Sequence, residues 1–161
     1  MYNFKIKLYF KVIFFVSLIS IISAFFIEYI LGHQPCNLCL IERIPYILSI
    51  MMIMAIFLIK KNQKFLVLLL ILTFIFSFAI SFYHFGIEQG FFQESSVCGV
   101  KSLTESVTKE DLLKQLSEKT ISCKDVTFRI FGLSLTSINI VISLLFIITL
   151  LKIFKKYEKN K

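Results

Sequence analysis

The four cysteines of the chain fall into two pairs with different surroundings. Cys36 and Cys39 form a C-x-x-C motif at the edge of an apolar stretch, whereas Cys98 and Cys123 lie in the only long polar stretch. A C-x-x-C motif is typical of thiol redox chemistry and of zinc binding. If both pairs face the same side of a membrane, thiol–disulfide exchange between them would carry electrons from the aqueous phase toward the lipid. The two pairs therefore predict a redox circuit.

Zinc binding is the alternative interpretation of the first pair. His33, Cys36 and Cys39 recur at a spacing of three residues and would supply three ligands, with Cys98 or Cys123 as the fourth. A structural zinc site needs four N or S ligands in a closed tetrahedron. Under this interpretation the protein is a non-catalytic membrane module that binds metal. An oxidising external compartment favours redox chemistry instead, and we expect no resident metal.

The second pair also has a purely structural interpretation. A permanent disulfide between Cys98 and Cys123 would stabilise the fold by about 3 to 4 kcal/mol in the chain-entropy model. Exposure of this loop and its nearness to a second dithiol favour exchange, in which a thiolate attacks one sulfur and a mixed disulfide forms. We expect these two cysteines to exchange.

Two charged side chains near the membrane boundary could act on a ligand. Arg43 follows Cys39 by four residues, so its guanidinium and the helix N-terminus would favour the thiolate form of Cys39. Arg43 would also polarise a planar acceptor that carries a carbonyl group, or else it reaches the lipid headgroups. His84, at the end of the third apolar stretch, is either an interfacial hydrogen-bonding residue or a proton donor to a ligand beside Arg43.

Four apolar stretches must position these residues. The chain has 161 residues, of which 57% are hydrophobic and 16% aromatic, and its mean hydropathy is +0.82. These values exceed those of soluble domains, and stretches of about 20 apolar residues can cross a bilayer as helices. We predict an all-α membrane protein with a single integral membrane domain, residues 1–161. Its antiparallel bundle has four transmembrane helices, at about 12–30, 40–59, 65–83 and 133–154.

The distribution of lysine and arginine predicts the orientation of this bundle. Eleven of these side chains lie in the N-terminal arm, the connector 60–64 and the C-terminal tail, which share one side. By the positive-inside rule that side is cytoplasmic, so both termini are expected there. The external loops, about 31–39 and 84–132, then carry all four cysteines. Since the positive charges gather at segment ends, the net charge of +8 indicates topology and not nucleic-acid binding.

The second external loop is too long for a simple connection. Within it, residues 109–119 follow a threonine that can cap a helix, and their leucines fall on one helical face. We predict a short amphipathic helix there, lying on the membrane surface or covering the bundle.

In these features the chain resembles the DsbB family of bacterial disulfide bond formation proteins. The resemblance covers nearly the whole chain and includes the four apolar stretches and the external loop with two cysteines. Its motifs are Cys36-Asn-Leu-Cys39-Leu-Ile-Glu-Arg43 opening the second stretch, Tyr83-His84 ending the third, and Phe131-Gly-Leu-Ser134 before the fourth. The C-x-x-C-x-x-E-R string at a membrane boundary is the most specific of these.

The resemblance implies an oxidoreductase of the bacterial inner membrane with its cysteines on the periplasmic side. Such an enzyme reoxidises the dithiol of a soluble, periplasmic DsbA-type protein with a thioredoxin fold. It passes the electrons to a membrane quinone, either ubiquinone or menaquinone. By this resemblance Cys98 forms the mixed disulfide with the partner, and Cys123 then engages Cys36.

The same resemblance implies a quinone site at the membrane end of the circuit. Cys39 resembles the thiolate that contacts the quinone ring, and Arg43 resembles the arginine that activates it. His84 matches a histidine near the ring.

Overall fold

The computed structural model describes residues 2–59, 63–94, 98, 122–124, 129–130 and 132–159. This part of the chain is dominated by four long helices: α1 (Tyr2–Tyr29), α2 (Asn37–Leu58), α3 (Gln63–Glu88) and α5 (Leu135–Lys159). Each contains a segment long and apolar enough to cross a membrane. The predicted all-α fold with four transmembrane helices is confirmed.

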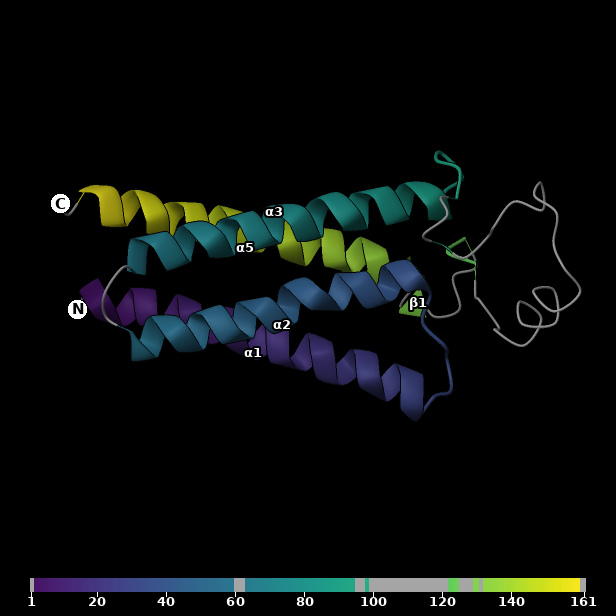
Figure 1. Cartoon of the computed structure of the whole chain (residues 1–161), viewed down its shortest axis with the longest axis horizontal. Coiled ribbons are helices and arrows are strands. Elements are labelled where there is room, and N and C mark those ends of the chain that lie inside the picture. The colour runs from purple at the N-terminus through teal and green to yellow at the C-terminus, as the bar shows by residue number, and fades with distance from the viewer. Residues whose placement is uncertain are drawn as a thin grey trace, which may run out of the picture.

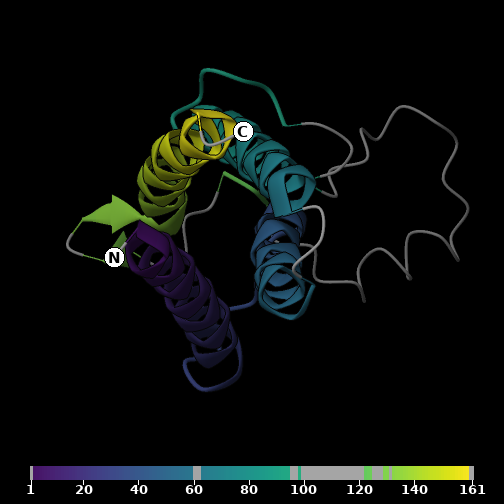
Figure 2. The same cartoon turned by 90° about the vertical axis from the view of Figure 1, so that its left-hand side faces the viewer.

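Successive helices run in opposite directions (Figure 1). Both termini therefore lie at one end of the bundle, and the four cysteines lie toward the other. Viewed along the bundle, the helices form a ring in which α3 lies between α2 and α5, and α1 lies beside α2 and closes the ring toward α5 (Figure 2). The contact between α3 and α5 is the most extensive, whereas α1 packs mainly on α2 and touches α5 lightly. That the end with the termini is cytoplasmic remains a prediction from the charge distribution.

Apolar side chains fill the half of the bundle near the termini. Two pairs of buried serines also join neighbouring helices: Ser49 donates to Ser17 over 2.9 Å, and Ser77 lies 3.1 Å from Ser143. Small polar residues let helices approach closely within a bilayer, and each such hydrogen bond contributes about 0.6 kcal/mol. The buried core comprises Ile6, Phe10, Ile13, Tyr46, Ile53, Ile56, Val67, Leu70, Ile71, Phe74, Phe146, Leu150 and Ile153.

The helix α3 ends later than predicted. It continues past Tyr83 to Glu88, so His84 lies within the helix and not in the external loop. His84 and Ile87 are both buried against the bundle, and burial of one helical face stabilises a further turn. Gly90, with a φ of +78°, then reverses the chain, because a left-handed backbone is readily adopted only by glycine.

The helix α5 begins later than the predicted start at residue 133. A short antiparallel ribbon precedes it, in which β1 (Arg129–Ile130) pairs with β2 (Leu133–Ser134). Gly132, with a φ of +83°, lies in the turn between the strands. Ser134 then caps the helix, since its hydroxyl accepts a hydrogen bond from the N–H of Ser137 over 3.2 Å. Hydropathy alone does not separate an apolar strand residue from the first residue of a helix.

The amphipathic helix predicted at 109–119 lies outside the described residues. The first predicted loop, 31–39, is shorter in the structure, because α2 already begins at Asn37.

Candidate active site

The two cysteine pairs meet at one end of the bundle. Cys98 and Cys123 form a disulfide with a Cα–Cα distance of 5.6 Å, and both are buried, at 1% and 2% exposed. They share an apolar cluster with Cys36, and Cys39 packs against that cluster. The expectation that the second pair is exposed was wrong, because its sulfurs pack beside the first pair instead of facing solvent.

Cys36 owes its position to the start of α2. It is the N-cap residue of the helix, and its Sγ accepts a hydrogen bond from the backbone N–H of Cys39 over 3.2 Å. The Nε2 atom of His84 lies 3.6 Å from the same sulfur. Hydrogen bonding with Cys39 and the nearby His84 lower the pKa of Cys36 to about 5, although burial opposes this. Reduced Cys36 is therefore a thiolate at neutral pH.

The sequence suggested a stabilised thiolate at Cys39, whereas the structure favours one at Cys36. Arg43 was expected to act on Cys39, but its guanidinium forms an ion pair with Glu28 of α1 over 2.5 Å. It also lies 5.2 Å from the centre of the Phe25 ring. The packing of α1 on α2 therefore determines the direction in which Arg43 points.

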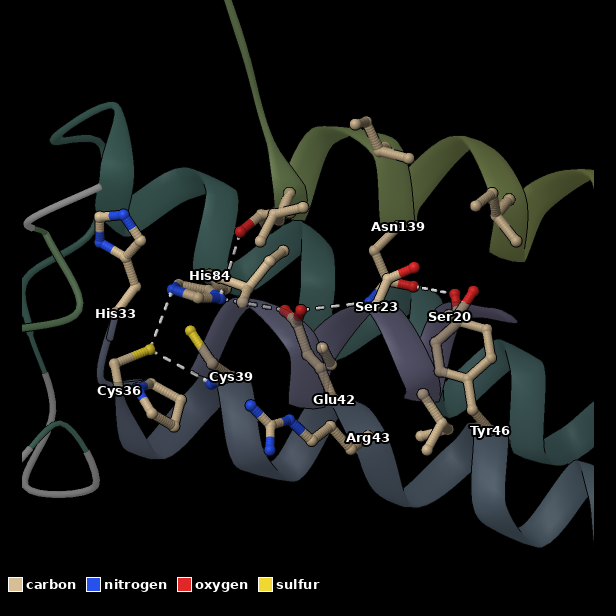
Figure 3. Close-up of a pocket in the computed structure, with 18 of the residues that line it drawn as sticks. Ser20, Ser23, His33, Cys36, Cys39, Glu42, Arg43, Tyr46, His84 and Asn139 are labelled. Atoms are coloured by element: carbon tan, nitrogen blue, oxygen red, sulfur yellow. Dashed lines mark hydrogen bonds and ion pairs between the residues drawn. The ribbon is translucent and has the colours of Figure 1, made fainter. Parts of the chain in front are cut away.

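His84 is held between helices by hydrogen bonds to both ring nitrogens. Its Nδ1 atom lies 3.0 Å from a carboxylate oxygen of Glu42, and its Nε2 atom faces Cys36 (Figure 3). The hydroxyl of Thr136 on α5 lies 3.4 Å from Nδ1. A protonated imidazole at this position would donate to both the carboxylate and the thiolate. The side chain is only 3% exposed.

The carboxylate of Glu42 is in turn held by α5. The side-chain amide of Asn139 donates to its second oxygen over 3.2 Å and to Ser81 over 2.7 Å. Tyr46 donates to the amide oxygen of Asn139. Sequence reasoning did not single out Asn139, although an amide within an apolar transmembrane stretch is a signal of a buried polar contact.

Glu88 completes the polar end of the site. One carboxylate oxygen accepts a hydrogen bond from Thr136 over 2.5 Å and lies 3.9 Å from Nε2 of His84. Among the residues that the structure describes, its other oxygen is buried without a hydrogen-bond partner. The sequence analysis gave Glu88 no role.

A cavity of about 310 Å³ opens beside these groups. Five of the six predicted site residues line it together: Cys36, Cys39, Arg43, His84 and Cys123. Of the two cysteines in the disulfide, Cys123 lines this cavity. The apolar part of the lining includes Ile19, Ala24, Ile27, Leu135, Ile138 and Ile142. The volume is at the lower end of the range for small-molecule sites, about 300 to 1,000 Å³.

The arrangement suits two kinds of chemistry at once. A disulfide and a dithiol within one cluster can exchange, and a cavity with a few polar groups on an apolar wall can hold a small planar molecule next to the dithiol. His33, proposed above as a metal ligand, also lines the cavity. Among the described residues, the group whose possible metal-ligand atoms all lie within 4.8 Å of one another is instead Cys36, Cys39 and His84.

Comparison with known proteins agrees with this chemistry. The family model for the disulfide bond formation protein DsbB matches residues 6–153. The chain is also similar to an uncharacterized protein of Rickettsia prowazekii (strain Madrid E). The two are 29% identical over 148 residues, which cover 91% of this chain and 86% of that protein.

Proposed function

The chain belongs to the DsbB family of disulfide bond formation proteins, and from this membership we propose that it is a thiol:quinone oxidoreductase. It is a multi-pass membrane oxidoreductase of disulfide bond formation. Its proposed electron donor is the dithiol of a periplasmic, DsbA-type protein with a thioredoxin fold, and its proposed acceptor is a membrane quinone. The observation that supports this assignment best is the buried Cys98–Cys123 disulfide packed against Cys36 and Cys39.

The outer pair receives the electrons. A thiolate of the partner attacks the sulfur of Cys98, a mixed disulfide forms, and Cys123 leaves as a thiolate. A second thiolate of the partner then attacks the mixed disulfide, so the partner departs oxidised and Cys98 is released as a thiolate. Two electrons have then entered the protein.

The inner pair passes these electrons on. The thiolate of Cys123 attacks Cys36 in an oxidised Cys36–Cys39 disulfide, and Cys39 leaves as a thiolate at the cavity. When Cys98 then attacks Cys123, the outer disulfide re-forms and Cys36 leaves. Hydrogen bonding from Cys39 and His84 lowers the pKa of Cys36, and a thiol of lower pKa leaves faster. The state described here, with an outer disulfide and two free inner thiols, corresponds to the point after this step.

The residues around the cavity fit a quinone. A quinone carries carbonyl oxygens that can accept hydrogen bonds from the guanidinium of Arg43, and its planar ring suits the apolar part of the lining. When bound, the quinone would supply a two-electron acceptor. Arg43 would hold a carbonyl oxygen, Cys39 would present its sulfur to the ring, and His84 would hold a proton near both.

The acceptor is needed on energetic grounds. DsbA is a strong oxidant with a potential of about −120 mV. Reoxidation of such a partner is therefore unfavourable unless a further acceptor removes the electrons, and a membrane quinone is such an acceptor. The periplasmic face of a bacterial inner membrane is the proposed location, because the cysteines lie at the end of the bundle opposite the lysine-rich termini.

Two single variants test the two ends of the circuit. We expect purified Cys98→Ser to lose oxidation of a reduced DsbA-type partner, while a small dithiol still drives quinone reduction through Cys36 and Cys39. Cys39→Ser should lose quinone reduction with either donor. Met54→Leu, on an exposed surface of α2, serves as the matched control. Quinone reduction by Cys39→Ser at the wild-type rate would refute the proposed exit, and partner oxidation by Cys98→Ser would refute the proposed entrance.

A further inference from the structure

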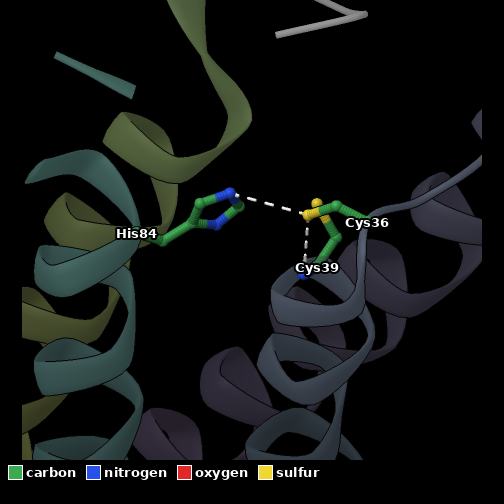
Figure 4. A group of neighbouring side chains, drawn as sticks. All are labelled: Cys36, Cys39 and His84. Carbon is green, nitrogen blue, oxygen red and sulfur yellow. Dashed lines mark hydrogen bonds between the residues drawn. The ribbon is translucent and has the colours of Figure 1, made fainter. Parts of the chain in front are cut away.

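Cys36, Cys39 and His84 bring three metal-binding atoms together. The two thiols come from the start of α2 and the imidazole from the end of α3, and their ligand atoms lie within 4.8 Å of one another (Figure 4). This set differs from the one that the sequence suggested, because His84 replaces His33. It is also created only by the fold, since 48 positions separate Cys36 from His84.

The spacing of two of these atoms matches a zinc ion. Zinc binds thiolate sulfur at about 2.3 Å and imidazole nitrogen at about 2.0 to 2.1 Å in a tetrahedron, which places the two atoms about 3.6 Å apart. The Sγ atom of Cys36 lies 3.6 Å from Nε2 of His84. The C-x-x-C spacing is the one that commonly supplies two sulfurs to a single ion. Cys36 and His84 therefore already lie at the separation that a shared zinc ion requires.

The surroundings of His84 provide independent support. Histidines that bind metal usually donate their other ring N–H to a carboxylate or carbonyl, which fixes the tautomer and the ring orientation. Here Nδ1 lies 3.0 Å from Glu42, and Asn139 holds the other oxygen of that carboxylate over 3.2 Å. With the proton on Nδ1, the lone pair of Nε2 points toward Cys36.

The charge balance also suits a buried ion. Two thiolates and a neutral imidazole bring two negative charges, which a divalent cation neutralises. This matters because Cys36 and His84 are both buried, and an unpaired buried charge is costly. Three protein ligands with a fourth position beside a cavity is the pattern of open zinc sites.

We propose that Cys36, Cys39 and His84 bind a thiophilic divalent cation of the zinc class when the inner pair is reduced, and that the bound ion inhibits the protein. Binding displaces the protons of any thiols that are still protonated and transfers no electrons. The sulfurs then hold the metal and cannot form a disulfide. The oxidised pair lacks thiolates and does not bind, so the site exists in only one redox state. The inhibition, though not the binding, rests on the proposed function.

Metal titration of the full-length protein tests the binding directly. In Cys98→Ser/Cys123→Ser protein reduced with a phosphine, we expect one Co²⁺ per chain with the visible absorption of tetrahedral thiolate coordination, and displacement by Zn²⁺. His84→Ala should weaken Zn²⁺ binding by about 100-fold, and Glu42→Gln by about 10-fold because it acts through His84. His33→Ala should leave the affinity unchanged. Circular dichroism establishes that each variant is folded.

Several outcomes would overturn the proposal. These are a reduced protein that binds no metal, equal binding by the oxidised protein, or an affinity that depends on His33 and not on His84. If His84→Ala does not fold, an unchanged affinity in Glu42→Gln overturns it. The metal titration needs neither quinone nor partner protein. The proposed metal site and the proposed oxidoreductase function can therefore be refuted independently. Metal binding without quinone reduction refutes the proposed function alone, whereas wild-type turnover that Zn²⁺ leaves unchanged refutes the inhibition.

Discussion

The sulfur of Cys36 lies 3.6 Å from Nε2 of His84, across the contact between α2 and α3. This contact links the cysteine pair to a polar network that spans three helices, because His84 is bonded to Glu42 on α2 and lies near Thr136 on α5. Cys36 also receives a hydrogen bond from its own helix terminus. The inner pair is therefore unequal, with a thiolate favoured at Cys36 and with Cys39 and its helical neighbour Arg43 lining the cavity.

Replacing His84 should change the pH dependence of Cys36. The pKa of this thiol is lowered from 9.0 to about 5, first by hydrogen bonding with Cys39 and also by His84. The thiolate forms as the pH rises through the pKa, so the alkylation rate of reduced wild-type protein should be half-maximal near pH 5 and reach its plateau about one pH unit higher. In His84→Ala the midpoint should move up by at least about one pH unit. Mass spectrometry of the alkylated Cys36 peptide at each pH measures this.

The control for this experiment is Thr73→Ser, on the same helix but away from the cysteines. It should keep the wild-type midpoint. An unchanged midpoint in folded His84→Ala would show that the histidine does not stabilise the thiolate.

Arg43→Lys should raise the KM for quinone without changing the rate at which Cys98 forms the mixed disulfide. The substitution keeps the charge but removes the planar fork that pairs with Glu28 and faces the cavity. We expect the KM for a quinone analogue to rise about tenfold, which corresponds to about 1.4 kcal/mol. Formation of the mixed disulfide at Cys98 should keep its rate, as measured by acid quenching.

Lys64→Arg, at the opposite end of the bundle, is the matched conservative control and should leave this KM unchanged. If Arg43→Lys keeps the wild-type KM, or if it slows the reaction at Cys98, the position assigned to the quinone is wrong.

Asn139→Leu should destabilise the bundle. It removes the donor to Glu42 and Ser81 and the acceptor of Tyr46, and so leaves buried polar groups without partners. The loss of free energy of unfolding should be about 1 to 3 kcal/mol, measured by denaturation in a detergent titration. Thr149→Val on the same helix should change it by less than about 0.5 kcal/mol, because the Thr149 hydroxyl donates to a carbonyl of its own helix, that of Leu145. Equal stability of the two variants would show that the Asn139 network adds nothing.

The sequence predicts the four helices well because hydropathy directly reflects the length of a membrane span. It predicts the ends less well, because they depend on local contacts such as the cap at Ser134 and the buried face around His84. The pairing of Arg43 with Glu28 was not predictable from spacing along α2, because it requires the packing of α1 on α2.

The candidate site was predicted in part. Cys39, Arg43 and His84 were singled out from their types and spacing, and the structure brings them to one cavity. Their catalytic roles remain predictions. Asn139 and Thr136 were missed because their significance depends on which face of α5 meets Glu42 and His84. The polarity of Asn139 within an apolar stretch was the available signal.

The most direct test of the redox circuit asks whether a disulfide forms between the inner and the outer cysteine pair. In Cys39→Ser/Cys98→Ser only Cys36 and Cys123 remain, and both line the same cavity. Upon mild oxidation, non-reducing mass spectrometry should find the Cys36 and Cys123 peptides linked in most of the protein. Cys39→Ser/Cys123→Ser, which keeps Cys36 and Cys98, should form the corresponding link far more slowly. Failure of Cys36 and Cys123 to link, or faster linkage through Cys98, would contradict the proposed route of the electrons.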